Sequence, residues 1–282
     1  MFELKLENAN GDIVDIDDGI RYIVTSASGL EPPPAAFYTS KSPNKKGVYF
    51  NGSTLNERSL ILTVKLLEDV EENRNYLYNW VDTEQYVKVH FMNNIKNVYC
   101  EGHIQECQIE FYTDNEVAVI AITCENPYWH ELQEISNEIR AIISHFTFAF
   151  AIDENGIPFS TLERNTEINV FNVGAETGCK ITIECSGDVR NLVIYDAKDT
   201  TRQFKIGTIL RENWKVEINT ETSPKTVKAF KPDGTVENLI KYIFNPTWFT
   251  LKKGNNIFDY TADSGVADAI ITFSYTNKYL GV

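Results

Sequence analysis

The residues most able to bind a metal or act as a base are four histidines, and they are isolated from one another. They are His90, His103, His130 and His145. Metal sites usually place two histidines one helical turn apart or pair a histidine with nearby cysteines, and neither spacing occurs here. We therefore predict no metal site, and we expect His90 and His103 on the solvent faces of neighbouring strands.

An acidic stretch near the start of the chain has the composition of a calcium loop without its spacing. Residues 12–19 hold four aspartates and end in a glycine. Counted from Asp15, a calcium-binding loop of the helix–loop–helix type needs Gly at the sixth position and Glu at the twelfth. Ile20 and Ser26 stand there instead. We predict a turn that leads into a strand.

Catalytic motifs are equally absent from the sequence. It contains no nucleophile elbow, no phosphate-binding loop and no dinucleotide fingerprint. The carboxylates are numerous, but no spacing singles out a pair for glycoside hydrolysis. The five cysteines form no C-x-x-C pair, and two of them follow the apolar phase of alternating strands, as buried free thiols do. We predict neither an enzyme nor a cofactor site, and free thiols at Cys100, Cys107, Cys124, Cys179 and Cys185.

Two tryptophans could bind sugar by stacking. β-Sandwich proteins that bind carbohydrate place the sugar ring against a flat aromatic face, and Trp214 and Trp248 are the candidates in the second half of the chain. Trp248 is followed directly by Phe249, so alternation along a strand would bury one of these two rings in the core. Core packing is therefore the competing interpretation of Trp248.

Composition and charge narrow the class of protein. The 282 residues carry 26 Lys and Arg against 40 Asp and Glu, a net charge of −14. An acidic surface repels phosphate, which argues against sequence-specific nucleic-acid binding. No apolar run is long enough to span a bilayer, and the N-terminus lacks the pattern of a signal peptide. The length favours two domains.

The first half alternates apolar and polar residues, as half-buried strands do. Strands are predicted over 59–66, 87–91 and 106–111, and another ends at Cys124. Residues 68–81 begin with acidic side chains and place Val70, Leu77, Trp80 and Val81 at helical spacing, which predicts one packed helix.

The region before the first of these strands has two unusual segments. Residues 30–36 are too rich in proline for a helix or a central strand, so they form either an extended edge or arm, or a stiff surface loop. The cluster Lys41–Lys46 is the only basic one in the sequence. We interpret it as a solvated hairpin tip in preference to a phosphate site.

The second half is read as strands and turns after a short helix. Apolar residues at three- and four-residue spacing over 130–143 predict that helix. Short alternating segments follow, which predict a β-sandwich. Near the end, 247–251 reads as an aromatic strand that turns at Gly254 into another strand. The predicted strands are 146–150, 181–185, 192–194, 204–206, 214–218, 257–260 and 271–275. We place a first domain at 1–137, a linker, expected to be helical, at 138–144 and a second domain at 145–282.

Several short motifs resemble one known family, the distal tail proteins of long-tailed bacteriophages. In the first half they are Gly19–Ile23, Gly29–Pro32, Gly47–Gly52, Arg58 and Cys124–Trp129. In the second half they are Asn172–Gly174, Ile181–Ile183, Asn191–Ile194, Glu217–Thr220, Trp248–Leu251, Gly254–Asn256 and Ser274–Val282. Asn219 stands where the family pattern leads us to expect Asp.

The resemblance implies a mainly β protein with little helix. Its first domain would be like a tail tube protein, with one packed helix, and would form a six-membered ring at the virion tail tip. Its second domain would be a galectin-like antiparallel β-sandwich that carries receptor-binding proteins or other baseplate parts. The implied partners are other copies of the chain, the tail tube protein and the tail-tip or tail-lysin protein, with DNA passing through the ring. The alternative is a lectin-like protein that attaches to the host wall through Trp214 and Trp248.

Overall fold

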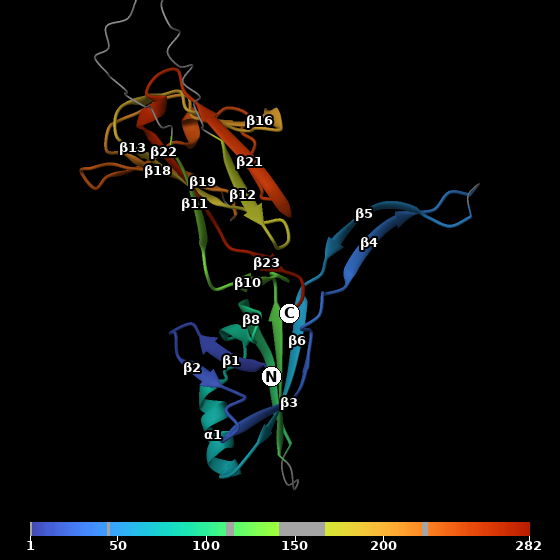
Figure 1. Ribbon diagram of the computed structural model, residues 1–282. Helices are drawn as coiled ribbons and strands as arrows, with labels where there is room; N and C mark the ends of the chain where they lie inside the picture. Colours follow the sequence, from blue (N-terminus) through green and yellow to red (C-terminus); the bar gives the residue numbers. More distant parts are fainter. Residues whose placement is uncertain (1, 44–45, 111–115, 141–166, 222–224) are drawn as a thin grey trace, which may run out of the picture. The chain divides into compact units, whose positions relative to one another are not determined.

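The chain folds into two compact units. The computed structural model describes residues 2–43, 46–110, 116–140, 167–221 and 225–282 (Figure 1). The first unit contains residues 1–133 together with 278–282, and the second contains 134–277. No helix among the described residues is long and apolar enough to cross a membrane.

The first unit is built on one antiparallel sheet. Seven of its strands follow the order β2-β1-β7-β8-β9-β6-β3, while β10 pairs with β8 and β23 pairs with β10. The strands are β1 Glu3–Asn8, β2 Ile13–Asp15, β3 Tyr22–Ser28, β6 Arg58–Leu66, β7 Tyr86–Met92, β8 Asn97–Ile109, β9 Val117–Cys124, β10 Trp129–Glu131 and β23 Lys278–Tyr279.

The alternation in the sequence produces the core of this sheet. Leu60, Leu62 and Val64 on β6 are fully buried, and so are Ile120 and Ile122 on β9. The intervening residues of these strands are more exposed. The strands predicted at 59–66 and 87–91 and the strand that ends at Cys124 are confirmed, because burying one face of each strand satisfies the period of two. The strand predicted at 106–111 is the end of β8, which stops at Ile109, and residue 111 lies outside the described residues.

The predicted helix is also confirmed as α1, Val70–Trp80. It lies beside the sheet in Figure 1 and buries Leu77 against it, with Val81 buried just after its last residue. The Tyr22 hydroxyl donates a hydrogen bond of 2.7 Å to the Asn73 carbonyl, which ties β3 to the helix. Tertiary packing therefore holds this three-turn helix, as is general for short helices.

A separate hairpin rises from the first unit. Strands β4, Ala35–Ser40, and β5, Tyr49–Leu55, pair with each other in a two-stranded sheet (Figure 1). Lys41 and Lys46 lie in the connection between them, so the predicted hairpin tip is confirmed for its described residues, 41–43 and 46.

The second unit is a sandwich of two antiparallel sheets. The larger follows the order β11-β22-β13-β18-β19-β20, and the smaller follows β12-β21-β15-β16. Phe258 of β21 stacks on Phe273 of β22 with ring centroids 4.7 Å apart, so the core lies between the sheets. The elements are β11 Ile135–Arg140, β12 Ile168–Asn172, β13 Lys180–Cys185, β14 Val189–Arg190, β15 Val193–Asp196, β16 Asp199–Lys205, β17 Ile209–Leu210, β18 Lys215–Asn219, β19 Thr226–Phe230, β20 Val236–Asn238, η1 Ile240–Tyr242, β21 Gly254–Thr261, η2 Val266–Asp268 and β22 Ala269–Tyr275.

The helix predicted over 130–143 is wrong for its described part. Residues 129–131 form β10 and residues 135–140 form β11, which pairs with β22 over six residues. Ile135 and Ile139 fit either structure by spacing, and pairing with a distant strand decides between them. Three residues of the linker expected at 138–144 are therefore strand, while the rest of it and the strand expected at 146–150 lie outside the described residues.

The aromatic strand predicted at 247–251 is also wrong. Residues 245–250 have no regular structure, and Leu251 makes only an isolated bridge to Thr177. Pro246 has no N–H for a ladder, and Asn245 has a left-handed φ of 46°. Gly254 begins β21 itself, so the turn comes earlier than expected.

Candidate functional site

The first candidate site centres on a buried arginine. Arg58, the first residue of β6, is 1% exposed. Its Nη1 donates to the Glu31 carbonyl at 2.8 Å and also to the Gly29 carbonyl, and its Nη2 donates to the Leu280 carbonyl at 2.7 Å. Both Nε and Nη2 donate to the Pro127 carbonyl, at 2.9 and 2.7 Å. We call these five residues the Arg58 junction.

The junction is held by carbonyl dipoles around a buried charge. The guanidinium carbon also lies 5.4 Å from the ring centre of Trp129, which is fully buried. Burial lowers the pKa of Arg58 from its ordinary high value. The hydrogen bonds to these four backbone carbonyls fix three loops in place and commit the guanidinium nitrogens to the fold.

The last residues of the chain complete the first unit. Trp129 of β10 lies opposite Tyr279 of β23. The Lys96 ammonium donates to the Gly281 carbonyl at 2.6 Å and sits 4.6 Å from the Tyr279 ring centre. The Val282 amide donates to the Leu30 carbonyl at 3.2 Å. Residues 278–282, which the sequence placed in the second domain, therefore fold with the first unit.

A glycine is required beside the arginine. Gly29 has a φ of +85°, and a Cβ added to it would lie 2.0 Å from the Ser59 carbonyl oxygen. Only glycine combines this left-handed backbone with such a close approach.

The motifs that carry the family resemblance thus meet in space. Gly29–Pro32, Arg58, Cys124–Trp129 and Ser274–Val282 are far apart in the sequence, and each contributes a residue to the Arg58 junction or to its immediate surroundings. Sequence reasoning named all four but missed that they converge, because nothing local indicates which carbonyls the guanidinium reaches.

The histidines and aspartates that could have bound metal have other partners. His90 lies 2.7 Å from Glu7, and His103, the more exposed, lies 2.8 Å from Glu125. His145 is outside the described residues. Among the residues described, no group of three or more His, Cys, Asp and Glu side chains could hold a metal ion.

The acidic stretch at 12–19 forms the predicted turn. Asp18 Oδ1 accepts hydrogen bonds from the backbone N–H groups of Ile20, Arg21 and Tyr22 at 2.8 to 3.1 Å. Burial acts to raise the pKa of Asp18, but these three donors and the Arg21 charge outweigh it and lower the pKa overall. The carboxylate therefore stabilises the entry into β3.

All five cysteines are free thiols, as predicted. Burial raises the pKa of Cys107 to about 11 and that of Cys185 to about 12. Cys124 hydrogen-bonds with Cys100, and this contact raises the pKa of Cys124. Protonated, buried thiols of this kind are poor nucleophiles.

The two tryptophans considered for sugar binding lie in different segments of the second unit. Trp248 packs edge-on against Phe204 with centroids 5.2 Å apart, and the Lys225 ammonium lies 5.3 Å from its ring centre. Trp214 has the Lys231 ammonium 5.0 Å from its ring centre. Both rings are half-buried against the core, and each has a lysine beside it. The neighbouring Phe249 is fully buried, so one ring of the pair lies in the core as expected, although the segment is not the strand from which this was predicted.

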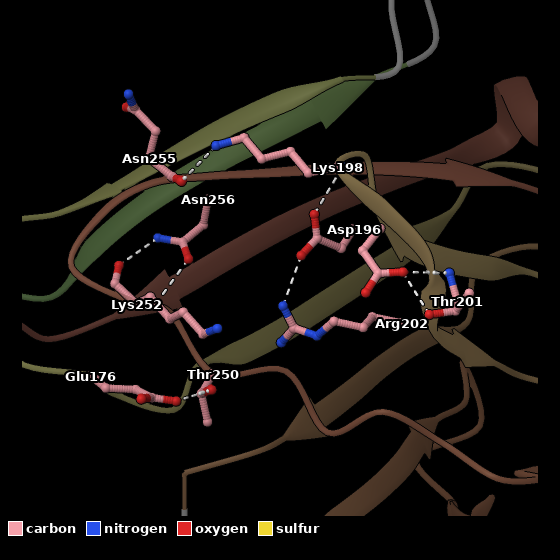
Figure 2. A network of polar contacts seen from close by, with 10 residues as sticks. Glu176, Asp196, Lys198, Thr201, Arg202, Thr250, Lys252, Asn255 and Asn256 are labelled. Atoms are coloured by element: carbon pink, nitrogen blue, oxygen red, sulfur yellow. Dashed lines mark hydrogen bonds and ion pairs between the residues drawn. The ribbon is translucent and has the colours of Figure 1, made fainter.

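A polar network in the second unit fixes turns (Figure 2). The Arg202 guanidinium donates to Asp196 at 2.8 Å, and the Thr201 hydroxyl donates to Asp199 at 2.6 Å. The Asn256 side chain donates to the Lys252 carbonyl at 2.8 Å and accepts from its N–H at 2.9 Å. Figure 2 shows these side chains pointing at one another and at the backbone, which is the arrangement of a loop support.

Other family motif positions of this unit also support loops. The Asn172 side chain is fully buried and donates to the Ala175 and Leu251 carbonyls at 2.8 and 2.9 Å. The Thr220 hydroxyl both accepts from the Cys179 amide and donates to its carbonyl. In this unit, too, the resemblance rests on residues that build the fold.

The second candidate site is the surface of the β4–β5 hairpin. Phe37 is 67% exposed and Phe50 is 64% exposed, and their rings meet edge-on with centroids 5.9 Å apart. Tyr38 and Tyr49 are exposed as well. Large apolar side chains gathered on a protruding element mark an interaction surface.

The comparisons with known proteins identify the kind of protein. Residues 174–279 match the family model for the siphovirus-type tail component, C-terminal domain. Over this segment the chain is similar to that family. No curated protein sequence matches the chain.

Solved structures are similar in fold over nearly the whole chain. The chain is similar to the Dit protein of phage SPP1, described as a paradigm of the hub adsorption apparatus in phages that infect Gram-positive bacteria, with 13% identity, 99% of both chains covered and a TM-score of 0.70. It is also similar to chains of the phage P2 baseplate in its activated conformation, with calcium (13% identity, 100% of both chains, TM-score 0.53) and with strontium (13%, 98% of both, 0.52). At 13% identity, this similarity shows a shared fold and nothing more specific.

Together these findings confirm the resemblance to distal tail proteins, the mainly β fold class and the location at the virion tail tip. The protein is a structural component of the phage tail and baseplate.

Proposed function

We propose that this tail component forms a six-membered hub ring that joins the tail tube to the baseplate. Its first unit would build the ring, and its second unit would carry receptor-binding or other baseplate proteins. The observation that carries the proposal is the fold match over 99% of both chains to SPP1 Dit, a protein described as part of a hub adsorption apparatus. In this role the chain acts by binding partners and performs no chemistry.

Physical properties of the chain support a ring. An assembly of identical subunits with head-to-tail contacts must close to avoid an open filament. Closure also covers sheet edges, which otherwise recruit other chains. The net charge of −14 suits a ring through which DNA passes, because like charges oppose adsorption of DNA to the wall.

Light scattering across a range of concentrations tests the ring. We expect the mass of six copies, reached by the protein alone or in the presence of the neighbouring tail tube and tail-tip proteins. A protein that stays monomeric at every concentration, even with those partners present, would contradict the proposal.

Host-wall adhesion through the second unit is the alternative. Trp214 and Trp248 are half-buried, so each leaves part of its ring accessible to a ligand. Pulldown on purified cell walls tests it with the full chain and with Trp214→Ala and Trp248→Ala. Binding that is lost in a folded variant would favour adhesion, and no binding by the unaltered chain would favour a pure adaptor.

A further inference from the structure

We propose that a polar cavity at the end of α1 is a binding site for a neutral saccharide. The cavity has a volume of about 620 Å³ and lies in the first unit. Its walls come from the turn between β1 and β2, the last turn of α1 and the loop that leads to β7. The inference goes beyond the proposed ring and does not depend on it, because the cavity is formed within one copy of the chain.

Five polar side chains of the cavity are not used by the fold. They are Asn10, Asn79, Asp82, Thr83 and Glu84, and all are exposed. None of these side chains makes a hydrogen bond or an ion pair with another residue that the structure describes. The two amides and the hydroxyl can donate as well as accept, whereas the two carboxylates only accept. The cavity thus offers both kinds of hydrogen-bonding group to a ligand.

The walls of the cavity are held in position by other side chains. The Asn8 side-chain oxygen accepts hydrogen bonds from the Asn10 and Asp12 N–H groups, both at 2.9 Å. The Gln85 side-chain oxygen accepts from the Asp82 N–H at 3.1 Å, and the Gln85 N–H donates to the Asp82 carbonyl at 3.1 Å. Walls that are fixed in advance reduce the entropy that binding costs, so the free side chains are presented on a preorganised frame.

The charge of the cavity excludes anionic ligands. Asp12, Asp82 and Glu84 line it, and no lysine, arginine or histidine does. The last turn of α1 contains no basic residue either, and the free carbonyls at the end of the helix add negative potential. Phosphates, nucleic acids and acidic peptides are therefore repelled. A metal ion is also disfavoured, because the described residues include no group of three or more His, Cys, Asp and Glu that could hold one.

The donors of the cavity distinguish a saccharide from an organic cation. An ammonium group needs acceptors only, so it leaves the Asn10 and Asn79 amide N–H groups and the Thr83 hydroxyl without a partner. Each sugar hydroxyl both donates and accepts, so it can pair with the amides, the hydroxyl and the carboxylates alike. A neutral saccharide is the ligand class that satisfies the whole lining.

Trp80 adds an aromatic surface to the cavity. Its side chain is half-buried, packs on the core of the first unit and also lines the cavity. A flat aromatic surface of this kind can pack against the C–H face of a sugar ring. The indole nitrogen is buried and has no hydrogen-bond partner among the described residues. Buried donors are normally paired, and we assign a hydroxyl of the ligand as the missing acceptor.

Saturation-transfer NMR with the full chain tests the site. The probes are neutral trisaccharides built from glucose, galactose, mannose or N-acetylglucosamine, with n-butylammonium as the cationic probe. We expect at least one trisaccharide to bind and n-butylammonium not to bind. Since the ligand is uncharged, its affinity should stay within about twofold between roughly 50 and roughly 500 mM salt.

A pair of variants assigns the binding to the cavity. Asn79→Ala with Glu84→Ala removes an amide and a carboxylate from the cavity, and we expect the affinity for the bound trisaccharide to fall by about tenfold or more. Asn94→Ala with Glu57→Ala removes the same two groups from exposed positions outside the cavity and should leave the affinity unchanged. None of these side chains has a partner within the described chain, so both variants should remain folded, which circular dichroism checks.

The outcomes separate this inference from the other proposals. It is overturned if no trisaccharide binds, if n-butylammonium is the only probe that binds, or if the two pairs of substitutions weaken binding equally. Binding that survives in the cavity variant but is lost in Trp214→Ala or Trp248→Ala would also overturn it, because the saccharide would then bind the second unit. None of these results bears on the six-copy ring, which the mass of the assembly tests separately.

Discussion

The Arg58 junction and the β4–β5 hairpin differ in which side chains they bury and which they expose. At the junction a charged side chain is 1% exposed and its nitrogens are engaged by four carbonyls. On the hairpin, two phenylalanines are about two-thirds exposed. A buried charge is tolerated only when it is fully hydrogen-bonded, and exposed aromatic rings persist where a partner covers them.

This difference distinguishes residues that stabilise the fold from residues that are available for association. The junction joins β6 to three distant loops and uses motif residues of the family resemblance. The hairpin contains the motif Gly47–Gly52, yet most residues of β5 are exposed. We therefore expect changes at the junction to reduce stability and changes on the hairpin to reduce association.

The largest loss of stability is expected when Arg58 is removed. Arg58→Ala removes the donor shared by four carbonyls and the buried side chain that carries it, and we expect the free energy of unfolding to fall by roughly 4 kcal/mol or more. Chemical denaturation followed by hydrogen exchange of the first unit measures this. Arg211→Ala, which removes an exposed ion pair with Asp188, is the control and should change stability little. Equal effects of the two variants would show that the junction is not structural.

A smaller loss of stability is expected from a substitution in the backbone of the junction, at Gly29. Gly29→Ala adds a Cβ 2.0 Å from the Ser59 oxygen to a residue with left-handed φ, and we expect a loss of about 3 kcal/mol. Gly234→Ala shares the positive φ, +81°, but its Cβ would meet nothing within 4 Å. That control should lose about 1 kcal/mol from strain alone. The melting temperatures of the Gly29→Ala and Gly234→Ala variants separate the effect of the clash with Ser59 from the effect of backbone strain.

The turn at Asp18 is expected to give an effect on stability of intermediate size that depends on pH. The pKa of Asp18 is lowered in the folded protein, so its contribution to stability is present at neutral pH and is lost as the pH falls below about 4. Asp18→Asn keeps an oxygen acceptor for the three N–H groups but cannot ionise. We expect the stability difference between the unaltered protein and this variant to shrink between pH 7 and pH 3. A stability difference that stays the same from pH 7 to pH 3 would show that the charge of Asp18 does not contribute to stability.

The smallest stability effect is expected on the hairpin. Phe37→Ser and Phe50→Ser alter exposed side chains, so the free energy of unfolding of the monomer should change by less than about 0.5 kcal/mol. Thermal unfolding at a concentration below assembly measures this. A loss of several kcal/mol would mean that the aromatic rings serve the fold.

Much of the fold could be predicted because burial is periodic. The alternation along β6 and β7 and the acidic start of α1 are local signals, and each produced the expected element. Local signals failed where a distant partner decided the structure. Ile135 and Ile139 allow a helix by spacing, but pairing with β22 makes them part of a strand.

The candidate sites were less accessible from the sequence for the same reason. The motif residues around Arg58 were recognised separately, but their convergence depends on a loop after β3, a loop after β9 and the end of the chain meeting at one guanidinium. The hairpin tip was recognised from its lysines. The exposure of Phe37 and Phe50 could not be predicted, because aromatic residues in strands are usually in the core.

Hydrogen–deuterium exchange of the protein as a monomer and in its assembled state tests the division between folding and assembly most directly. The account predicts that amides of residues 35–55 exchange fast in the monomer and become protected in the assembly, while those of 278–282 are equally slow in both. Unchanged exchange in the hairpin, or protection of 278–282 that appears only on assembly, would contradict it.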